Sequence, residues 1–376
     1  MKKKVCVITS VHQAYDGRIY HKQCKSLVKH GYEVILIAPT PENITIARED
    51  NINLITINKP NSEWKRFLKT LTVIKLALNT KADLFHFHDP ELIPAGTLIR
   101  LISRKPVIFD VHEHYPNAIM SKRYLKTWLK IPIRWVYEII EKVCLPVMSG
   151  IVYTTKEIGA RYKKYKSVKI ENYPLKGMFT QTRKDCIAPK KLLYLGGITA
   201  IRGIEELIHA MEVVVKNEPE TTTLTFVGAF ESKAFETKIK NLISELDLEN
   251  HILFKGKVPY EDIEKYLSTS SIGIIPYLPV PNHLVCLPNK LFEYMASGVA
   301  VVASDFDHYG EVVNQSNSGI TVDPSNPLSI AHGLLSLMRD PEKVRSFSSN
   351  GQYWFNEKYN WEIEEKKLIN FYQNFI

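Results

Sequence analysis

The chain has 376 residues, of which 45% are hydrophobic and 24% charged, and this composition is typical of a globular protein long enough for two full cores. No apolar run approaches the ~18 residues of a membrane span, so we expect no transmembrane helix. Five scattered cysteines without a Cys-x-x-Cys spacing argue against a disulfide framework and a zinc site, and they predict a reducing, cytoplasmic location.

The net charge of +9 is divided unevenly along the chain. Residues 1–184 contain 32 Lys and Arg against 15 Asp and Glu, whereas residues 185–376 contain 17 against 25. A basic half and an acidic half are typical of two domains with different partners. The basic half could face an anionic membrane surface or an anionic substrate. It contains no readout motif or regular base-stacking platform, which disfavours nucleic acid.

Apolar runs of buried-strand character alternate with helix-length segments along the whole chain. In the first half the runs are Val5–Thr9, Val34–Ala38, Leu54–Ile57, Leu84–His88, Val107–Val111, Ile151–Thr154 and Val168–Glu171. In the second half they are Leu192–Leu195, Leu224–Val227, Ile252–Phe254, Ile272–Ile275, Val299–Ala303 and Ile320–Val322. The intervening helical segments of the first half are Arg18–His30, Trp64–Asn79, Glu91–Ser103 and Lys122–Leu145.

Continuous Val/Ile/Leu runs joined by helices predict parallel sheets covered on both faces. The expected fold class is therefore α/β, with two doubly wound, Rossmann-like domains that face a cleft. We place the N-terminal domain at 1–178 and the C-terminal domain at 186–355, joined by a polar linker. The aromatic C-terminal helix, at about 356–376, is expected to dock back on the first domain.

In such folds ligands bind at the carboxyl ends of the strands, so the loops after strands are the expected positions of site residues. The loop after the first strand carries His12, Asp16 and Arg18 and no Gly-x-Gly-x-x-Gly, which disfavours a dinucleotide site. Asp16 could be the N-cap of the following helix. We expect His12 and Arg18 to open into the interdomain cleft.

Two further loops are rich in histidine. His86 and His88 should lie on the same side of their strand, and Asp89 is expected to cap a helix. A metal is one interpretation of this triad, but no distant ligand accompanies it. The run 110–114, Asp-Val-His-Glu-His, places four titratable groups at the next strand end. It could be a functional site or a hydrogen-bonded loop around a buried histidine.

Basic and aromatic residues interleave in the segment Ser121–Leu145. This pattern fits a protein lying on an anionic membrane and fits equally a solvated face with a buried stripe. Pro132 and Pro146 are expected to interrupt any long helix in the segment.

In the second half two segments have the character of a phosphate site. Leu192–Gly203 is a strand, a glycine-containing loop and a helix start with Arg202 at its entrance. In Pro288–Asp305 a short helix carries Lys290 and Glu293 and is followed by a buried strand. The helix N-terminus and Lys290 could meet phosphate while Glu293 accepts from ribose hydroxyls. The alternative is an ordinary helix–strand unit with a solvated lysine and glutamate.

Over essentially its full length the chain resembles the retaining, nucleotide-sugar-dependent glycosyltransferases of family 4, which have the GT-B architecture. The run from Lys290 to Ser304, Lys-Leu-Phe-Glu-Tyr-Met-Ala-Ser-Gly-Val-Ala-Val-Val-Ala-Ser, is similar to the family's Glu-Ala-Met-Ala-x-Gly-x-Pro-Val-Val-Ala-Ser signature. Arg202 stands in the place of the family's diphosphate-binding lysine. His112 matches the histidine that follows the family's Thr-x-His strand, near the donor sugar.

Three departures from the family pattern are visible. Gly197 replaces the arginine after the first glycine, and Val285 replaces the first glutamate of Glu-x7-Glu. The glycine-rich first loop is replaced by Ser10–Gly17. The missing glutamate leaves the sugar preference open, with Asn282 and His283 as the neighbours to examine, and Lys290 could replace the lost positive charge.

The resemblance implies a retaining hexosyltransferase or N-acetylhexosaminyltransferase that moves a sugar from a nucleotide diphosphate sugar, with uridine favoured. The acceptor would be a saccharide or a lipid-linked saccharide in bacterial surface-polysaccharide synthesis. No metal and no cofactor is expected, and an anionic membrane surface is a candidate partner on the inner face of the cell membrane. A nucleotide-sugar 2-epimerase of the same shape and a non-catalytic, transferase-like scaffold are the alternatives.

The residues expected to form the site fall into three groups. The expected catalytic residues are His112, Arg202 and Asp16. The expected donor-binding residues are Gly196, Gly197, Arg202, Lys290, Leu291, Glu293 and Asn289. The expected acceptor-binding residues are His12, Asp16, Arg18 and His88.

Overall fold

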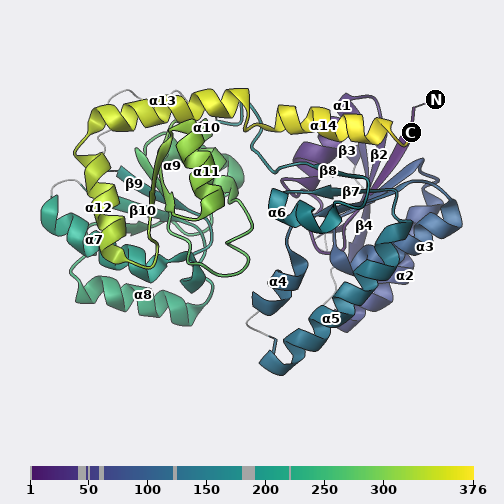
Figure 1. The fold of residues 1–376 in the computed structure, drawn as a ribbon, viewed down its shortest axis with the longest axis horizontal. Coiled ribbons are helices and arrows are strands. Elements are labelled where there is room, and N and C mark those ends of the chain that lie inside the picture. Colours follow the sequence, from purple (N-terminus) through teal and green to yellow (C-terminus); the bar gives the residue numbers. More distant parts are fainter. Residues whose placement is uncertain are drawn as a thin grey trace. The chain divides into compact units, whose positions relative to one another are not determined.

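A computed structural model describes residues 2–40, 48–49, 51–58, 63–121, 125–179, 191–219 and 222–376. The chain divides into two compact units (Figure 1). Unit 1 contains Met1–Asn172 and Trp361–Ile376, and unit 2 contains Tyr173–Asn360. Most of the expected linker, residues 180–190, lies outside the described residues.

Unit 1 is built on an eight-stranded sheet in the order β3-β4-β2-β1-β5-β6-β7-β8. Seven of the strands are parallel, and β3 pairs antiparallel with β4. The strands are β1 (Lys4–Ile8), β2 (Glu33–Thr40), β3 (Arg48–Glu49), β4 (Ile52–Asn58), β5 (Leu84–Phe87), β6 (Val107–Val111), β7 (Gly150–Tyr153) and β8 (Ser167–Lys169). Each predicted run of the first half is a strand of this sheet. The two-residue β3 has no apolar run and was not predicted.

One π-helical turn, Ile19–Cys24, leads into the first α-helix of unit 1. The α-helices are α1 (Lys25–Lys29), α2 (Glu63–Asn79), α3 (Ile93–Ser103), α4 (Tyr115–Ser121), α5 (Thr127–Cys144), α6 (Lys156–Gly159) and α14 (Trp361–Gln373). Helix α3 packs between α2 and α5 (Figure 1).

The prediction that Pro132 interrupts a long helix is wrong, because α5 continues through Pro132 to Cys144. Proline removes one helical N–H bond to the carbonyl four residues earlier, here that of Trp128. Both residues are exposed, so solvent can satisfy that carbonyl and the helix survives the proline. Pro146 lies beyond the end of α5, in a short 3-10 turn.

The C-terminal helix α14 packs on unit 1. The indole N–H of Trp361 donates to the Ser26 hydroxyl at 2.9 Å, and that hydroxyl donates to Glu365 at 2.8 Å. Trp361 and Tyr372 are fully buried, so the helix is part of the core of unit 1.

Unit 2 is built on a six-stranded parallel sheet in the order β11-β10-β9-β12-β13-β14. The strands are β9 (Lys191–Leu195), β10 (Thr223–Val227), β11 (Ile252–Phe254), β12 (Ile272–Ile275), β13 (Ala300–Ser304) and β14 (Gly319–Val322). Its helices are α7 (Ile204–Asn217), α8 (Lys233–Glu245), α9 (Ile263–Leu267), α10 (Asn289–Ala296), α11 (Asp307–Ser316), α12 (Pro327–Met338) and α13 (Pro341–Glu357).

Both sheets have the doubly wound topology that was predicted. The chain runs outward from the central strand in one direction and then in the other, so the strand order reverses between β1 and β5 in unit 1 and between β9 and β12 in unit 2. Ligands of such folds bind beside the carboxyl ends of the strands at this reversal. The loops after these four strands are therefore the places for a site.

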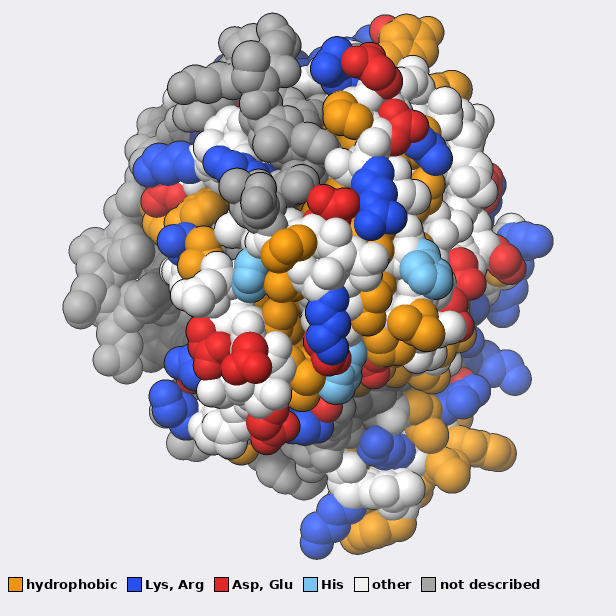
Figure 2. Space-filling model, turned by 90° about the vertical axis from the view of Figure 1, so that its left-hand side faces the viewer, with side chains coloured by type: hydrophobic (Ala, Val, Ile, Leu, Met, Phe, Trp, Pro, Cys, Tyr) orange, Lys and Arg blue, Asp and Glu red, His pale blue; other side chains and the backbone are white. Residues whose placement is uncertain are grey.

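Figure 2 looks onto the left-hand side of Figure 1, where Lys and Arg side chains are interspersed with Asp and Glu. Among the residues of that face that are coloured by type, neither sign of charge forms a continuous field. In the described part of the chain, no helix combines the length and the apolar character needed to cross a bilayer.

Candidate functional site

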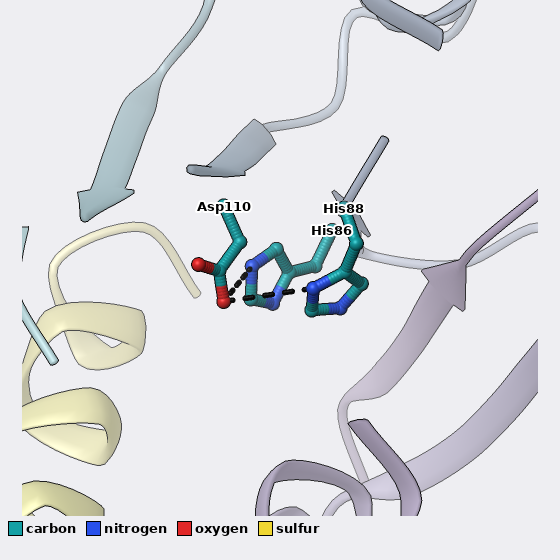
Figure 3. Close-up of side chains that lie close together, drawn as sticks. All are labelled: His86, His88 and Asp110. Atoms are coloured by element: carbon teal, nitrogen blue, oxygen red, sulfur yellow. Dashed lines mark ion pairs between the residues drawn. The ribbon is translucent and has the colours of Figure 1, made fainter. Parts of the chain in front are cut away.

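Near the point where the strand order of unit 1 reverses, buried histidines surround one aspartate. His86 lies in β5, His88 follows it, and Asp110 lies in the neighbouring strand β6. The two imidazoles lie on the same side of the strand, as alternation predicts, with ring centroids 4.7 Å apart. Figure 3 shows both rings beside the Asp110 carboxylate, at 3.7 and 3.6 Å from its Oδ2. We call His86, His88, Asp110 and His112 the histidine cluster.

The charge of Asp110 is balanced by Arg18. One guanidinium nitrogen, Nη2, lies 3.1 and 3.2 Å from the two carboxylate oxygens, and Gln23 donates to the same carboxylate at 2.6 Å. Asp110 is fully buried and Arg18 is 6% exposed. Burial alone would raise the pKa of Asp110, but the attraction of Arg18 and the neighbouring imidazoles outweighs it and holds the pKa well below its usual range.

The histidines of the cluster are neutral. Burial lowers the pKa of His86 and of His112 to about 4, and it holds the pKa of His88 well below 6.5. His88 Nδ1 lies 3.1 Å from His112 Nε2, a contact in which one ring must donate and the other accept. The histidine cluster thus places the Arg18–Asp110 ion pair among neutral imidazoles.

His86, His88 and Asp110 also have the spacing of metal ligands, because their ligand atoms lie within 4.8 Å of one another. The guanidinium of Arg18 already contacts both oxygens of Asp110. A cation at this point would be repelled by Arg18 and would have to displace the hydrogen bond from Gln23. The donor set therefore fits an internal ion pair better than a metal centre.

Asp89 has a different role from the one predicted. It stands before the 3-10 turn Pro90–Leu92, but its side chain makes no capping bond there. Its Oδ2 instead accepts from the Thr9 hydroxyl at 2.8 Å and from the Ser10 amide at 2.6 Å. The buried carboxylate of Asp89 thus fixes the loop that follows β1. It bonds to donors of that loop and makes no bond to the amides of the short turn.

His12 in that loop is the most accessible imidazole near the cluster, with 38% of its side chain exposed. Its Nδ1 lies 3.3 Å from Asp16, and its ring lies 5.6 Å from the ring of His112. Asp16 also accepts from the backbone amides of Arg18 and Ile19, as a capping carboxylate does, although the N-cap residue of the π-helical turn that follows is Arg18.

Pairing with Asp16 raises the pKa of His12 above 6.5. Burial would raise the pKa of Asp16, but the bonds from His12 and Ile19 lower it to about 2. A histidine whose pKa is raised by folding stabilises the folded state fully below pH 6.5, and this contribution is lost as the pH rises through the folded-state pKa.

We expect NMR titration of the imidazoles to separate these environments. His12 should titrate above 6.5, whereas His86 and His112 should stay neutral until about pH 4. Asp16→Asn should move the His12 midpoint downward and leave the other two unchanged. A wild-type His12 midpoint below 6.5 would contradict the pairing with Asp16.

In unit 2 the strand reversal carries a glycine loop. Gly196 and Gly197 follow β9, and a 3-10 turn ending at Arg202 leads into α7. Gly203 has a φ of +66°, and a Cβ there would lie 1.9 Å from the carbonyl oxygen of Pro276. Only glycine fits here, because the backbone at residue 203 packs directly against the backbone at the end of β12.

Lys290 is a buried cation beside that loop. It is 6% exposed, and among the described residues its Nζ has no hydrogen-bond partner. A Cβ built on Gly196 would lie 3.4 Å from this Nζ and 3.2 Å from Arg202 Nη1, so both cations adjoin the same glycine. We call Lys290 and Arg202 the cation pair.

Aromatic rings surround the cation pair. The Lys290 ammonium lies 3.8 Å from the ring centroid of Tyr194 and 4.9 Å from that of Tyr277, and the Arg202 guanidinium lies 5.2 Å from the latter. Burial, followed by repulsion from Arg202, holds the pKa of Lys290 well below 10.5. A buried cation without a hydrogen-bond partner beside a second cation is the electrostatic complement of an anion.

Helix α10 has the predicted form, beginning at Asn289 and ending before Gly298, whose φ is +66°. Glu293 is buried on it and accepts from the Tyr260 hydroxyl at 2.8 Å. The interpretation of Lys290 and Glu293 as solvated side chains is therefore wrong. Asn289 is exposed at the helix start, whereas the side chain of Leu291 is fully buried in the core.

Near the position of the missing glutamate, the ring of His283 stacks on Tyr277 with centroids 4.5 Å apart. Its Nδ1 lies 3.0 Å from the carbonyl oxygen of Leu278. Val285 is partly buried two residues further on. The loop after β12 thus places His283 against Tyr277, whose ring also lies beside Lys290.

Sequence reasoning missed three tyrosines and one glutamine around these groups. Tyr277 follows β12 at the strand reversal, so the strand-end rule could have identified it. Tyr194, Tyr260 and Gln23 reach their partners through tertiary packing and have no local signal.

The two units match two family models. Residues 17–171 match the model described as Glycosyltransferase Family 4, and residues 186–354 match the model described as Glycosyl transferases group 1.

Three known proteins illustrate what the chain is similar to. An uncharacterized glycosyltransferase of Methanocaldococcus jannaschii is 24% identical over 93% of this chain and 91% of its own. The amylovoran biosynthesis glycosyltransferase AmsK of Erwinia amylovora is 24% identical over 65% of this chain and 54% of its own. The structure of Anabaena HepE in complex with UDP and glucose superposes with a TM-score of 0.74 at 14% identity, covering 99% of this chain and all of the other. The likeness in structure extends over both units and shows the GT-B fold.

Proposed function

We propose that this chain, a glycosyltransferase with the GT-B fold, transfers a sugar from a nucleotide diphosphate sugar to a saccharide or lipid-linked saccharide, with retention at the anomeric carbon. The observation that carries the donor assignment is the cation pair. A buried ammonium without a hydrogen-bond partner is destabilising unless the protein binds an anion beside it. A diphosphate supplies that anion and is the leaving group of the reaction.

The donor residues have distinct roles in this proposal. Lys290 and Arg202 neutralise the diphosphate and stabilise the charge that it gains as the glycosidic bond to the sugar breaks. The Gly196–Gly197 loop lets the phosphates approach the backbone, and the N-terminus of α10 at Asn289 adds amide donors. Glu293, oriented by Tyr260, accepts from the ribose hydroxyls.

On unit 1 we propose that His12 and Asp16 bind the acceptor hydroxyl, since both side chains are partly exposed. His112, which has a small exposed fraction, would orient the donor sugar. Arg18 and His88 are buried and hold the cluster together, so the expected acceptor contacts do not extend to them.

The finer parts of the proposal rest on relatives. HepE is described in complex with UDP, which favours a uridine donor, and AmsK is described in amylovoran biosynthesis, which favours a polysaccharide product. We propose that the reaction requires no metal, because the cation pair supplies the charge that a metal would supply. We propose a cytoplasmic location, which the unpaired cysteines Cys6, Cys24, Cys144 and Cys286 support.

A transfer assay with the full chain tests the proposal. We expect one of a panel of uridine, guanosine and adenosine diphosphate sugars to glycosylate a saccharide or lipid-linked acceptor, with the anomeric configuration of the donor retained by NMR. Chelation with EDTA should leave the rate unchanged. Conversion of a nucleotide sugar into its 2-epimer without acceptor, or the absence of both transfer and donor hydrolysis with every donor, would contradict the proposal.

A further inference from the structure

Helix α5 presents an apolar face to solvent. Trp128 and Trp135 are 69% and 65% exposed, and the same stripe continues with Ile131, Ile139 and Val143. Spacings of three and four residues place these side chains on one face of the helix. The alternative of a buried stripe in this segment is therefore wrong for both tryptophans.

The inward side of α5 is held by a buried carboxylate. Glu141 accepts from the hydroxyls of Tyr137 and Tyr162 at 2.9 and 2.6 Å and pairs with Arg161. These bonds fix which side of the helix faces the core. The tertiary packing of α5 thus directs its apolar face to solvent.

Helix α3, which packs against α5, also exposes Leu98, Leu101 and Ile102. Single exposed apolar side chains are ordinary, but a group of them on two adjacent helices is typical of an interaction surface. We call the exposed apolar residues of α3 and α5 the apolar ridge.

Cations flank the apolar ridge. Residues 126–144 contain Lys126, Lys130, Arg134 and Lys142 against two glutamates. Glu138 pairs with Arg134 at 2.9 Å, and Glu141 is buried with Arg161. Both acidic charges of the helix are therefore compensated, and the exposed surface beside the tryptophans is basic. Lys122, Arg123 and Tyr124 of the predicted basic stretch lie outside the described residues.

We propose that the apolar ridge docks on an anionic lipid bilayer, with α5 lying in the plane of the interface. Tryptophan favours the level of the lipid headgroups, and lysine and arginine beside it are attracted to anionic lipids. A second copy of this chain is a poorer occupant. A twofold dimer would bring the same cations of both copies together. The proposal is independent of the transfer reaction and is measured without substrate.

Vesicle sedimentation with the full chain tests this docking. We expect the wild type to pellet with phosphatidylcholine vesicles containing about 30 mol% phosphatidylglycerol at about 50 mM salt, and less with phosphatidylcholine alone or at about 500 mM salt. Trp128→Ser/Trp135→Ser should weaken binding at least about tenfold, since it removes the large interfacial side chains. Lys126→Glu/Lys142→Glu should weaken binding to the anionic vesicles only.

The matched control is Leu328→Ser/Tyr353→Ser, which removes two exposed apolar side chains of unit 2 and should bind as the wild type does. All of these substitutions are at exposed positions, and thermal unfolding checks that each variant is folded. The proposal is overturned if the wild type stays in the supernatant with anionic vesicles at low salt, or if the tryptophan variant binds equally well. A wild-type dimer that the tryptophan variant disperses, without vesicle binding, would assign the apolar ridge to a second copy.

Discussion

Asp110→Ala is expected to destabilise unit 1 by about 3–5 kcal/mol. The substitution leaves the guanidinium of Arg18 buried without the carboxylate that it contacts through Nη2 at 3.1 and 3.2 Å. Nε and Nη1 of Arg18 have no hydrogen-bond partner among the described residues, so the described contacts offer no second carboxylate to compensate the charge. Gln23 would also lose the acceptor of its amide.

Scanning calorimetry measures this effect, because the two units can unfold in separate transitions. A loss of 3–5 kcal/mol should lower the midpoint of the affected transition by roughly 10 °C. The control is Asp83→Ala, a partly exposed aspartate of the same unit that pairs with Lys105 at 3.2 Å. A pair at the surface contributes about 1 kcal/mol or less. Equal shifts for the two variants would show that the buried pair does not stabilise unit 1.

Lys290→Met is expected to have opposite effects on catalysis and on stability. If the cation pair stabilises the departing diphosphate, removing one charge should lower the transfer rate roughly 10²–10³-fold. The same change replaces a buried ammonium by an apolar side chain of similar length, so it should raise the free energy of unfolding by about 1 kcal/mol or more. A residue with only a structural role would not lose activity while gaining stability.

The pH dependence gives this prediction a second readout. Burial lowers the folded-state pKa of Lys290, so the destabilisation is full below that pKa and disappears as the pH approaches 10.5. The difference in unfolding free energy between wild type and Lys290→Met should therefore shrink as the pH rises. Lys265→Met, an exposed lysine of the same unit, serves as the control and should change neither quantity appreciably. Lower stability of Lys290→Met would contradict the account.

The sequence predicted the parts of the fold that depend on local pattern. Continuous apolar runs identified the seven parallel strands of unit 1 and the six of unit 2, and the glycine and proline positions identified the ends of α10. Antiparallel β3 was missed, because two residues carry no periodicity. The direction of the α5 face was also left open, since periodicity reveals two sides of a helix but not which one the tertiary structure buries.

The site was predictable only in part for a similar reason. Lys290 and Arg202 follow from a helix start and a glycine loop, which are local features. The Arg18–Asp110 pair joins residues 92 positions apart, and only the parallel pairing of β1, β5 and β6 brings them together. The side-chain bonds of Asp89 depend equally on the neighbouring strand, so a local rule predicted a capping bond that Asp89 does not form.

We propose that the cation pair of unit 2 binds a nucleoside diphosphate, and calorimetric titration with uridine diphosphate and with uridine tests this binding. We expect saturable binding of the diphosphate to the wild type, much weaker binding of the nucleoside, and a smaller difference between the two in Lys290→Met. The phosphates supply the difference because they alone meet Lys290 and Arg202. Guanosine and adenosine diphosphates in the same experiment identify the base. Equal affinity for nucleoside and diphosphate, or an unchanged difference in Lys290→Met, would contradict the account.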